Sequence, residues 1–134
     1  MDFAYSDEQQ AAIELARQIL TDHCTPQKLR ALDLAGGPRF DRALWKRMGE
    51  LGFLGAPIPE AYGGAGMDYI SFAILCEELE RADTAFRVVQ SVHVGLNSLA
   101  RLQWGSEDHK QRFLVPQARG DKIATFGLTE PGVG

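Results

Sequence analysis

Cysteine is scarce in this sequence, with only Cys24 and Cys76 among 134 residues. So low a count excludes a disulfide-stapled scaffold and favours a reducing compartment. Long hydrophobic runs are also missing, because no stretch of about 18 apolar residues is available to span a membrane. The first residues lack the basic start and the apolar stretch of a secretory signal. We therefore expect a soluble, cytoplasmic domain.

Positive charge is limited too, with 14 Lys and Arg against 18 Asp and Glu and a formal net charge of −4. Nucleic-acid binding would need a basic stripe, so we expect no such partner. No metal site is expected either, since His23 and Cys24 have no second pair at metal-ligand spacing. What is present is an ordinary globular composition, 45% hydrophobic and 24% charged, in a chain of single-domain length.

Apolar residues at helical spacing, interrupted by capping residues, predict about six helices. Glycine and proline separate them, as at Gly36 and Gly37 and again near Gly105. The fourth helix is apolar over 70–76, and we place it deep in the core. Pro116 is expected to end or kink the sixth. The expected ranges are about 6–20, 26–35, 41–51, 68–82, 84–103 and 106–116.

The pattern changes after Gly120, where 122–128 alternate in character and predict a strand. A single strand is not stable alone, because its backbone groups need a neighbour. The predicted fold is therefore all-α: an amino-terminal helical bundle domain of about six helices over 1–121. Residues 122–134 would be the first strand of a truncated β domain.

The fifth predicted helix carries small and hydroxyl residues on one narrow stripe, among them Ser91 and Gly95. Such a stripe indicates close packing against another backbone or against a bound ligand. Arg87 is the only charge on it, and a buried arginine needs an anionic partner. Asp83, four residues earlier, is one candidate. An acidic group of a ligand is the other, and the sequence leaves both open.

Two glycine-rich segments could approach a ligand closely. The first, Gly63–Gly66, follows no strand and lacks the GxGxxG order, so a turn is the expectation there. The second, Thr129–Gly134, follows the predicted strand, and its glycines would let a heterocycle approach unpaired backbone N–H groups. A plain turn explains it equally. No nucleophile–base pair and no catalytic pair of carboxylates is evident, and His93 and His109 are isolated.

Five segments in this order resemble the amino-terminal part of the acyl-CoA dehydrogenase family, and together they cover nearly the whole chain. In that family's three-domain architecture they would form the helical first domain and the entry into the middle β domain. The segments are Leu44–Phe53, Pro59–Gly66, Glu77–Asp83, Trp104–Glu107 and Phe126–Gly132.

The resemblance implies a flavoenzyme that uses FAD to desaturate an acyl-CoA thioester between its α and β carbons. A carboxylate removes the α-proton while a hydride leaves the β-carbon for the flavin. The resemblance further implies an electron-transfer flavoprotein as acceptor and a homotetramer. The family's catalytic carboxylate lies in a carboxy-terminal helical domain, so no catalytic residue is assigned here, and this chain alone is predicted to be inactive.

The resemblance also assigns residues, in two places. The segment that lines FAD would supply Phe126, Gly127, Leu128, Thr129, Gly132 and Gly134. Residues 85–92 look most like the glutaryl-CoA dehydrogenase branch, in which Arg87 would bind the distal carboxylate of a dicarboxylic substrate, with Val88 and Ser91 beside it. Val88 departs from that branch, which tends to carry a small hydroxyl residue there.

Other functions stay open at this stage. A superfamily flavin oxidase, a monooxygenase or a carrier-protein-linked desaturase would share these segments. A non-catalytic helical binding domain is a further alternative, although an unpaired strand after residue 122 would invite aggregation.

Overall fold

The computed structural model describes residues 4–37 and 40–133, which form six helical rods, as predicted. The first four are single helices. The fifth and sixth are each continuous rods of three segments, the middle one a wider π-helical turn. The bounds are α1 Asp7–His23, α2 Pro26–Leu34, α3 Arg42–Glu50, α4 Tyr69–Ala82, α5 Thr84–Ser91, η3 Val92–Ser98, α6 Leu99–Trp104, α7 Glu107–His109, η4 Lys110–Leu114 and α8 Val115–Ala118.

The helix starts follow from side-chain caps that occupy free backbone N–H groups. Ser6 and Gln9 form a reciprocal capping box at the start of α1. Asp41 caps α3 and Asp68 caps α4, each by accepting backbone N–H groups of the first turn without a reciprocal bond. The fifth rod is capped by Asp83, whose carboxylate accepts from the N–H of Ala85 at 2.7 Å. The predicted boundaries are thereby confirmed to within a few residues.

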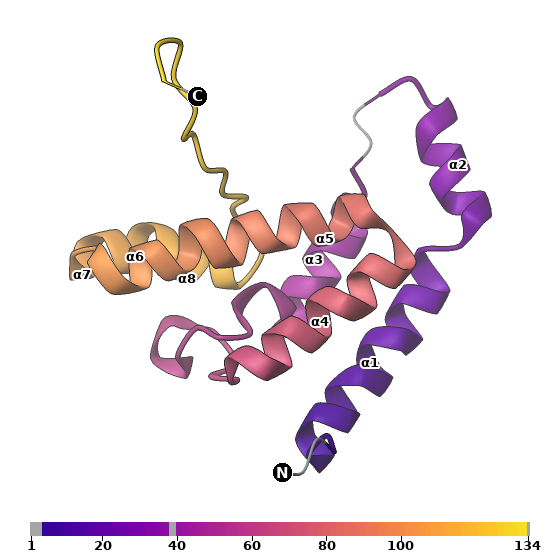
Figure 1. The fold of residues 1–134 in the computed structure, drawn as a ribbon, viewed down its shortest axis with the longest axis horizontal. Coiled ribbons are helices and arrows are strands. Elements are labelled where there is room, and N and C mark those ends of the chain that lie inside the picture. The colour runs from indigo at the N-terminus through magenta and orange to yellow at the C-terminus, as the bar shows by residue number, and fades with distance from the viewer. Residues whose placement is uncertain (1–3, 38–39, 134) are drawn as a thin grey trace.

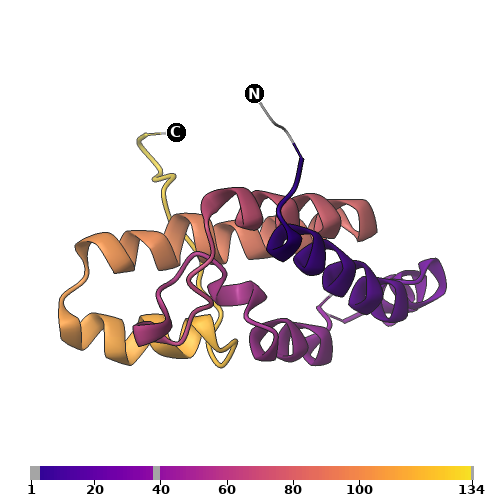
Figure 2. The ribbon, with the colours of Figure 1, turned by 90° about the horizontal axis from the view of Figure 1, so that it is seen from below.

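The rods stack in two layers with the core between them (Figures 1 and 2). One layer holds α4 and the long rod α5–η3–α6, and α1 packs along α4. The other holds α3 and the rod α7–η4–α8. Two short 3₁₀ turns, η1 Phe53–Gly55 and η2 Glu60–Tyr62, connect α3 to α4. The largest fully buried apolar side chains are Leu44, Met48, Leu54, Ile58, Leu75, Leu79, Leu114 and Val94.

The prediction that α4 lies deep in the core is wrong for its first turn. Tyr69 is 67% exposed and Ile70 is 61% exposed, whereas Ile74, Leu75 and Leu79 are buried. The cause is geometric: among the described elements, α1 and α5 contact α4 and cover only part of its circumference. The apolar run in the sequence therefore gives one buried face and one apolar patch that stays in contact with solvent.

Pro116 neither ends nor interrupts the sixth rod, which continues to Ala118. It lies in the first turn of α8, directly after the π-helical segment η4. A proline cannot donate to the carbonyl oxygen four residues earlier, which here belongs to Arg112. That oxygen accepts a hydrogen bond from Lys122 Nζ at 2.9 Å. The expected break is thus compensated by a side chain from the following segment.

The predicted strand over 122–128 is not paired in the described part of the chain. Residues 123–129 adopt no regular secondary structure, and the only β-type pairing nearby among the described residues is an isolated bridge between Glu130 and Val133. This segment leaves the helical layers after α8 and projects away from them (Figure 1). The all-α fold is confirmed, while a strand here still depends on neighbours. No helix among the described residues is long and apolar enough to cross a bilayer.

Candidate functional site

Residues 123–129, called the exit segment below, pass across the long rod at its π-helical part and lead into the predicted flavin contacts. His93 contacts this segment at Ala124, two residues before Phe126. The His93 ring is fully buried, with its plane edge-on to Trp45 at a ring-centroid distance of 4.9 Å. Its Nδ1 accepts the N–H of Ala124 at 3.0 Å, so the proton sits on Nε2, which donates to the carbonyl oxygen of Gln117 at 3.1 Å. Burial lowers the pKa of His93, so the ring is neutral.

Asn97, one turn further along the rod, binds the next residue of the same segment. Its Nδ2 donates to the carbonyl oxygen of Thr125 at 2.9 Å. Its Oδ1 accepts from Arg101 Nε at 2.8 Å and from Gln117 Nε2 at 3.2 Å. Ser98 completes the network by donating to the carbonyl oxygen of His93 at 2.9 Å. These polar side chains hold the exit of the chain from the helical domain.

The segment beyond this anchor has free hydrogen-bonding groups. The backbone N–H groups of 125–129 have no hydrogen-bond partner within the part of the chain that the structure describes. A Cβ added to Gly127 or Gly132 would meet nothing within 4 Å. Leu128 is 75% exposed, and Thr129 is exposed as well. An extended backbone with open space around it can accept a flat acceptor-rich ligand along its N–H groups.

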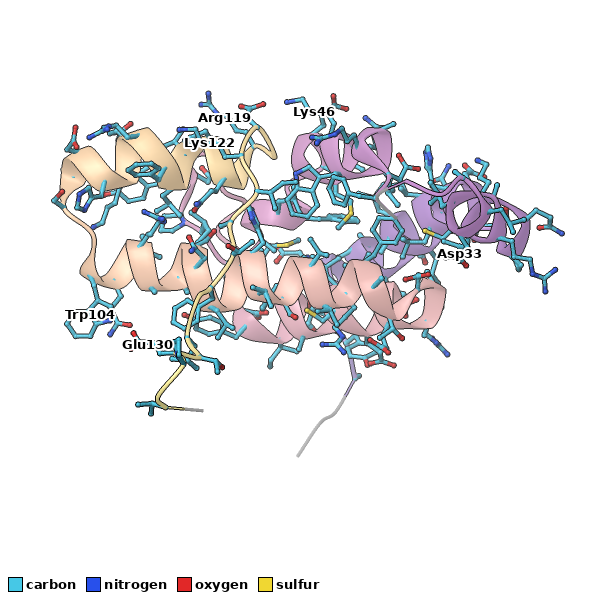
Figure 3. The ribbon with its side chains drawn as sticks, turned by 90° about the horizontal axis from the view of Figure 1, so that it is seen from above. Asp33, Lys46, Trp104, Arg119, Lys122 and Glu130 are labelled. Atoms are coloured by element: carbon cyan, nitrogen blue, oxygen red, sulfur yellow. The ribbon has the colours of Figure 1, made fainter. Side chains whose placement is uncertain are left out.

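Phe126 lines a hollow of about 280 Å³ at the end of the long rod. The opposite wall carries Trp104, which is 80% exposed. Figure 3 places Trp104 and Glu130 on one side of the rod, away from Lys46 and Arg119 on the other. The remaining lining residues are Leu96, Asn97, Ala100, Arg101, Gly105 and His109. Two exposed aromatic rings beside free backbone donors are suited to a ring-shaped ligand.

Residues 130–133 form a tight turn rather than an open loop. The backbones of Glu130 and Val133 exchange two hydrogen bonds, each of 3.1 Å, around Pro131 and Gly132. Within this turn the N–H of Gly132 has no partner among the described residues, and the other free donors lie before it, over 125–129. Gly134, the last predicted contact, lies outside the described residues.

Arg87 pairs with Glu80 and not with Asp83, one of the two candidate partners that the sequence left open. Arg87 Nε donates to Glu80 Oε2 at 2.6 Å, and this pairing lowers the pKa of the Glu80 carboxyl. The carboxylate of Asp83 is instead directed to the N–H of Ala85, as the cap of α5. The side chain of Arg87 is 35% exposed. Its two terminal nitrogens have no hydrogen-bond partner among the described residues, so they are available to a second anion.

The stripe with Ser91 and Gly95 is partly covered, because both residues are half-buried. Val88 and Leu96 are exposed, whereas Gln90 and His93 are fully buried. The buried polar groups find partners: Gln90 Nε2 donates to the carbonyl oxygen of Phe53 at 3.0 Å. Ser91 is half-buried, and its hydroxyl donates to the carbonyl oxygen of Val88 at 3.1 Å. The face with Val88 and Ser91 is therefore free to contact a ligand.

The other segments that the sequence singled out are structural. The N–H groups of Gly64 and Gly66 donate to backbone carbonyl oxygens, and a Cβ on Gly64 would lie 2.0 Å from the carbonyl oxygen of Ile58. This loop is a packed turn, as expected, and its amides are not free for a phosphate. No metal-binding cluster occurs among the described residues. Burial raises the pKa of the Cys24 thiol to about 11, which excludes a thiolate there at neutral pH.

Comparison with known proteins gives a consistent result. The family model described as the acyl-CoA dehydrogenase N-terminal domain matches residues 6–121. A short-chain specific acyl-CoA dehydrogenase from Clostridium acetobutylicum is 36% identical over the whole chain, which covers 35% of that protein. The chain therefore spans about a third of the length of this relative.

Solved structures with this fold include two with ligand information. A glutaryl-coenzyme A dehydrogenase–glutaryl-CoA complex aligns with a TM-score of 0.88 and 32% identity over 100% of this chain and 34% of its own. An acyl-CoA dehydrogenase from Bacillus anthracis complexed with FAD aligns with a TM-score of 0.86 and 36% identity, over 97% of this chain and 22% of its own.

Proposed function

Because this chain belongs to the acyl-CoA dehydrogenase family, we propose that it is the amino-terminal domain of an FAD-dependent enzyme that desaturates an acyl-CoA thioester between its α and β carbons. The observation that carries this proposal is the extended segment over 125–129, with free backbone N–H groups beside exposed aromatic rings. The FAD complex of a relative 36% identical to this chain supports it.

The residues present fit a flavin. The ring system of FAD offers carbonyl and ring-nitrogen acceptors, which match the free backbone N–H groups of this segment. Phe126 and Leu128 would contact its apolar part, and the Thr129 hydroxyl would donate to an acceptor. Gly127 and Gly132 leave room for close approach. When bound, FAD accepts the hydride, while these residues orient it and exclude water from one side.

The exposed face of the long rod would form one wall of the acyl pocket. Val88 supplies apolar surface. Ser91 adds little bulk to that surface, because its hydroxyl donates to the helix backbone. The side chains on this wall supply no base. We propose that the catalytic carboxylate comes from the part of the protein beyond this sequence, in line with the family resemblance.

A dicarboxylic substrate is the finer part of the proposal. Arg87 lies on the same face, and its two terminal guanidinium nitrogens remain available after the bond from Nε to Glu80. A guanidinium binds a carboxylate well, since its fork matches the two carboxylate oxygens. The relative in complex with glutaryl-CoA makes a dicarboxylic acyl group a reasonable class.

The electron acceptor and the assembly are carried over from the family. We propose an electron-transfer flavoprotein as acceptor, a homotetramer as the assembly and the cytoplasm as the location. An acceptor assay separates the proposed electron-transfer flavoprotein from the flavin-oxidase and monooxygenase alternatives. The flavoprotein would reoxidise the reduced enzyme, and molecular oxygen would do so much more slowly.

The test of the proposed function is flavin chemistry in the whole protein. The purified protein is expected to carry FAD with its visible absorption, and anaerobic addition of acyl-CoA is expected to bleach that absorption. Phe126→Ala should weaken FAD binding about tenfold by removing a ring contact. Leu34→Ala is the matched control, because Leu34 is exposed on α2 and remote in sequence from the site. A protein that binds no FAD would overturn the proposal.

A further inference from the structure

Two side chains of the π-helical segment η3 fix two consecutive residues of the exit segment. His93 Nδ1 accepts the N–H of Ala124 at 3.0 Å, and Asn97 Nδ2 donates to the carbonyl oxygen of Thr125 at 2.9 Å. One contact is an acceptor and the other a donor, so a shift of the segment by one residue would lose both. The pair thus sets the register and the direction of the chain at this point.

The anchoring groups are themselves held in place. The His93 ring is clamped between the edge-on contact with Trp45 and the hydrogen bond from Nε2 to the carbonyl oxygen of Gln117. Asn97 receives hydrogen bonds from Arg101 and Gln117, which orient its amide so that Nδ2 points at the exit segment. His93 is buried with both ring nitrogens bonded, and Asn97, although half-buried, has its amide oxygen and nitrogen bonded, so both side chains have few alternative rotamers.

The anchor lies directly before the residues assigned to the flavin. Ala124 and Thr125 precede Phe126, while the backbone N–H groups of 125–129 have no partner within the described chain. Apart from Ala124 and Thr125, the structure gives the segment no hydrogen bond to the helical rods before Glu130. His93 and Asn97 therefore make the last hydrogen bonds between the helical rods and the chain before those free donors.

We propose that His93 and Asn97 are positioning residues for the flavin, which act through the backbone of Ala124 and Thr125 and touch no ligand themselves. This inference rests on the proposed function, since it concerns the placement of the segment that would bind FAD. It assigns a role to a buried histidine outside the substrate and flavin contacts, whose neutral Nε2–H form is required for the contact.

The test separates the two hydrogen bonds of the ring. In His93→Asn the side-chain oxygen replaces Nδ1 and can still accept from Ala124, whereas in His93→Gln the amide nitrogen replaces Nε2 and only the bond to Gln117 remains. In the whole protein we expect His93→Gln to weaken FAD binding about tenfold, the value of one lost hydrogen bond. His93→Asn should stay within about twofold of wild type. Asn97→Leu should behave like His93→Gln.

Ser98→Ala is the matched control, because Ser98 is fully buried in the same network but contacts no residue of the exit segment. It should lower Tm without changing the FAD dissociation constant. Hydrogen exchange of the peptide containing Ala124 is the second readout, and it requires no flavin. Its rate should rise about tenfold in His93→Gln and stay near wild type in His93→Asn.

The outcomes are distinct. Loss of FAD affinity in His93→Gln with recovery in His93→Asn supports the inference. If affinity simply follows Tm through all variants, including Ser98→Ala, or if His93→Gln leaves it unchanged, positioning by His93 is overturned. If the wild-type protein binds no FAD, the proposed function fails, and the exchange data still decide whether His93 holds Ala124.

Discussion

At the scale of single residues, Arg87 is a cation with one bond made and two nitrogens available. Its removal should impair substrates with a distal carboxylate most, because a charge-assisted pair contributes about 1.5–3 kcal/mol. We expect Arg87→Ala in the whole protein to lower kcat/KM for glutaryl-CoA at least about tenfold more than for a simple acyl-CoA of equal length. Equal losses on both substrates would contradict the assignment.

The control for this prediction is Glu80→Gln, which removes the charge next to Arg87 but leaves the guanidinium in place. If Arg87 serves the substrate, this variant should retain or improve turnover of glutaryl-CoA. If Arg87 only stabilises the start of α5, both variants should lower Tm and spare the preference between substrates.

His93 gives the molecule a pH-dependent contribution to stability. Burial lowers its pKa below the ordinary 6.5, so the unfolded chain takes up the proton first as the pH falls. The contribution is complete above about pH 6.5 and is lost as the pH drops toward the lowered pKa, by at most about 1.4 kcal/mol per pH unit. We expect Tm to fall between about pH 7 and 5, and His93→Asn to reduce that slope. His109→Gln should retain it, because His109 is exposed.

At the scale of elements, the contact between α1 and α4 includes one buried carboxylate beside the apolar side chains of the core. Glu78 accepts two hydrogen bonds of 2.8 Å from Arg17 and one of 3.3 Å from Arg81. The hydrogen bonds from Arg17 are the main cause of the lowered pKa of Glu78. The stabilisation that the ionised Glu78 carboxylate provides is present above the ordinary pKa of 4.5. It is lost as the pH falls through the lowered pKa.

Glu78→Gln should therefore lower the free energy of unfolding at pH 7 by about 1–2 kcal/mol. The variant should also lose less stability than wild type on further acidification, as measured by urea unfolding. Asp108→Asn removes an exposed pair with Arg112 and should change stability by no more than about 0.5 kcal/mol. An equal effect of both substitutions would show that burial of Glu78 does not matter.

The helices themselves could be predicted because their signals are local. Ser6, Asp41, Asp68 and Ser106 each bind an N–H within three residues, so the sequence alone contains the information. The buried faces could not be predicted with the same success. Which side of α4 or of the long rod is covered depends on elements distant in sequence. Exposed Ile70 was therefore assigned to the core, and no local signal marked the burial of Gln90.

The candidate site likewise has one part that the sequence predicts and one part that only the folded chain reveals. The segment with Phe126 and Thr129 was found from its resemblance to a family, and the structure shows its backbone free. The anchor could not be found, because His93 and Ala124 lie 31 positions apart and only the folded chain brings them into contact. Asp83 was the nearest acidic residue to Arg87 along the helix, but its use as a helix cap redirected Arg87 to Glu80.

At the scale of the whole molecule, the proposed function makes the described chain one wall of a site. The chain spans 35% of the length of the Clostridium acetobutylicum relative, and its free donors and exposed aromatic rings have no cover within the described residues. We expect the 134-residue chain alone to show no acyl-CoA dehydrogenase turnover, even with added FAD and an acceptor dye. The whole protein, assayed in parallel, is the positive control. Detectable turnover by the isolated chain would show that the base lies within it.

The bond from the Trp45 indole to the carbonyl oxygen of Gly120, at 3.1 Å, spans 75 positions of the sequence. During synthesis the ribosome releases α3 long before it releases Gly120. The surface that contains Trp45 can therefore fold before residues 120–125 are available to bind it. When residues 120–125 emerge, Trp45, His93 and Asn97 can bind them in turn. The helical domain would then fix the position and the direction of the residues after 125 during translation.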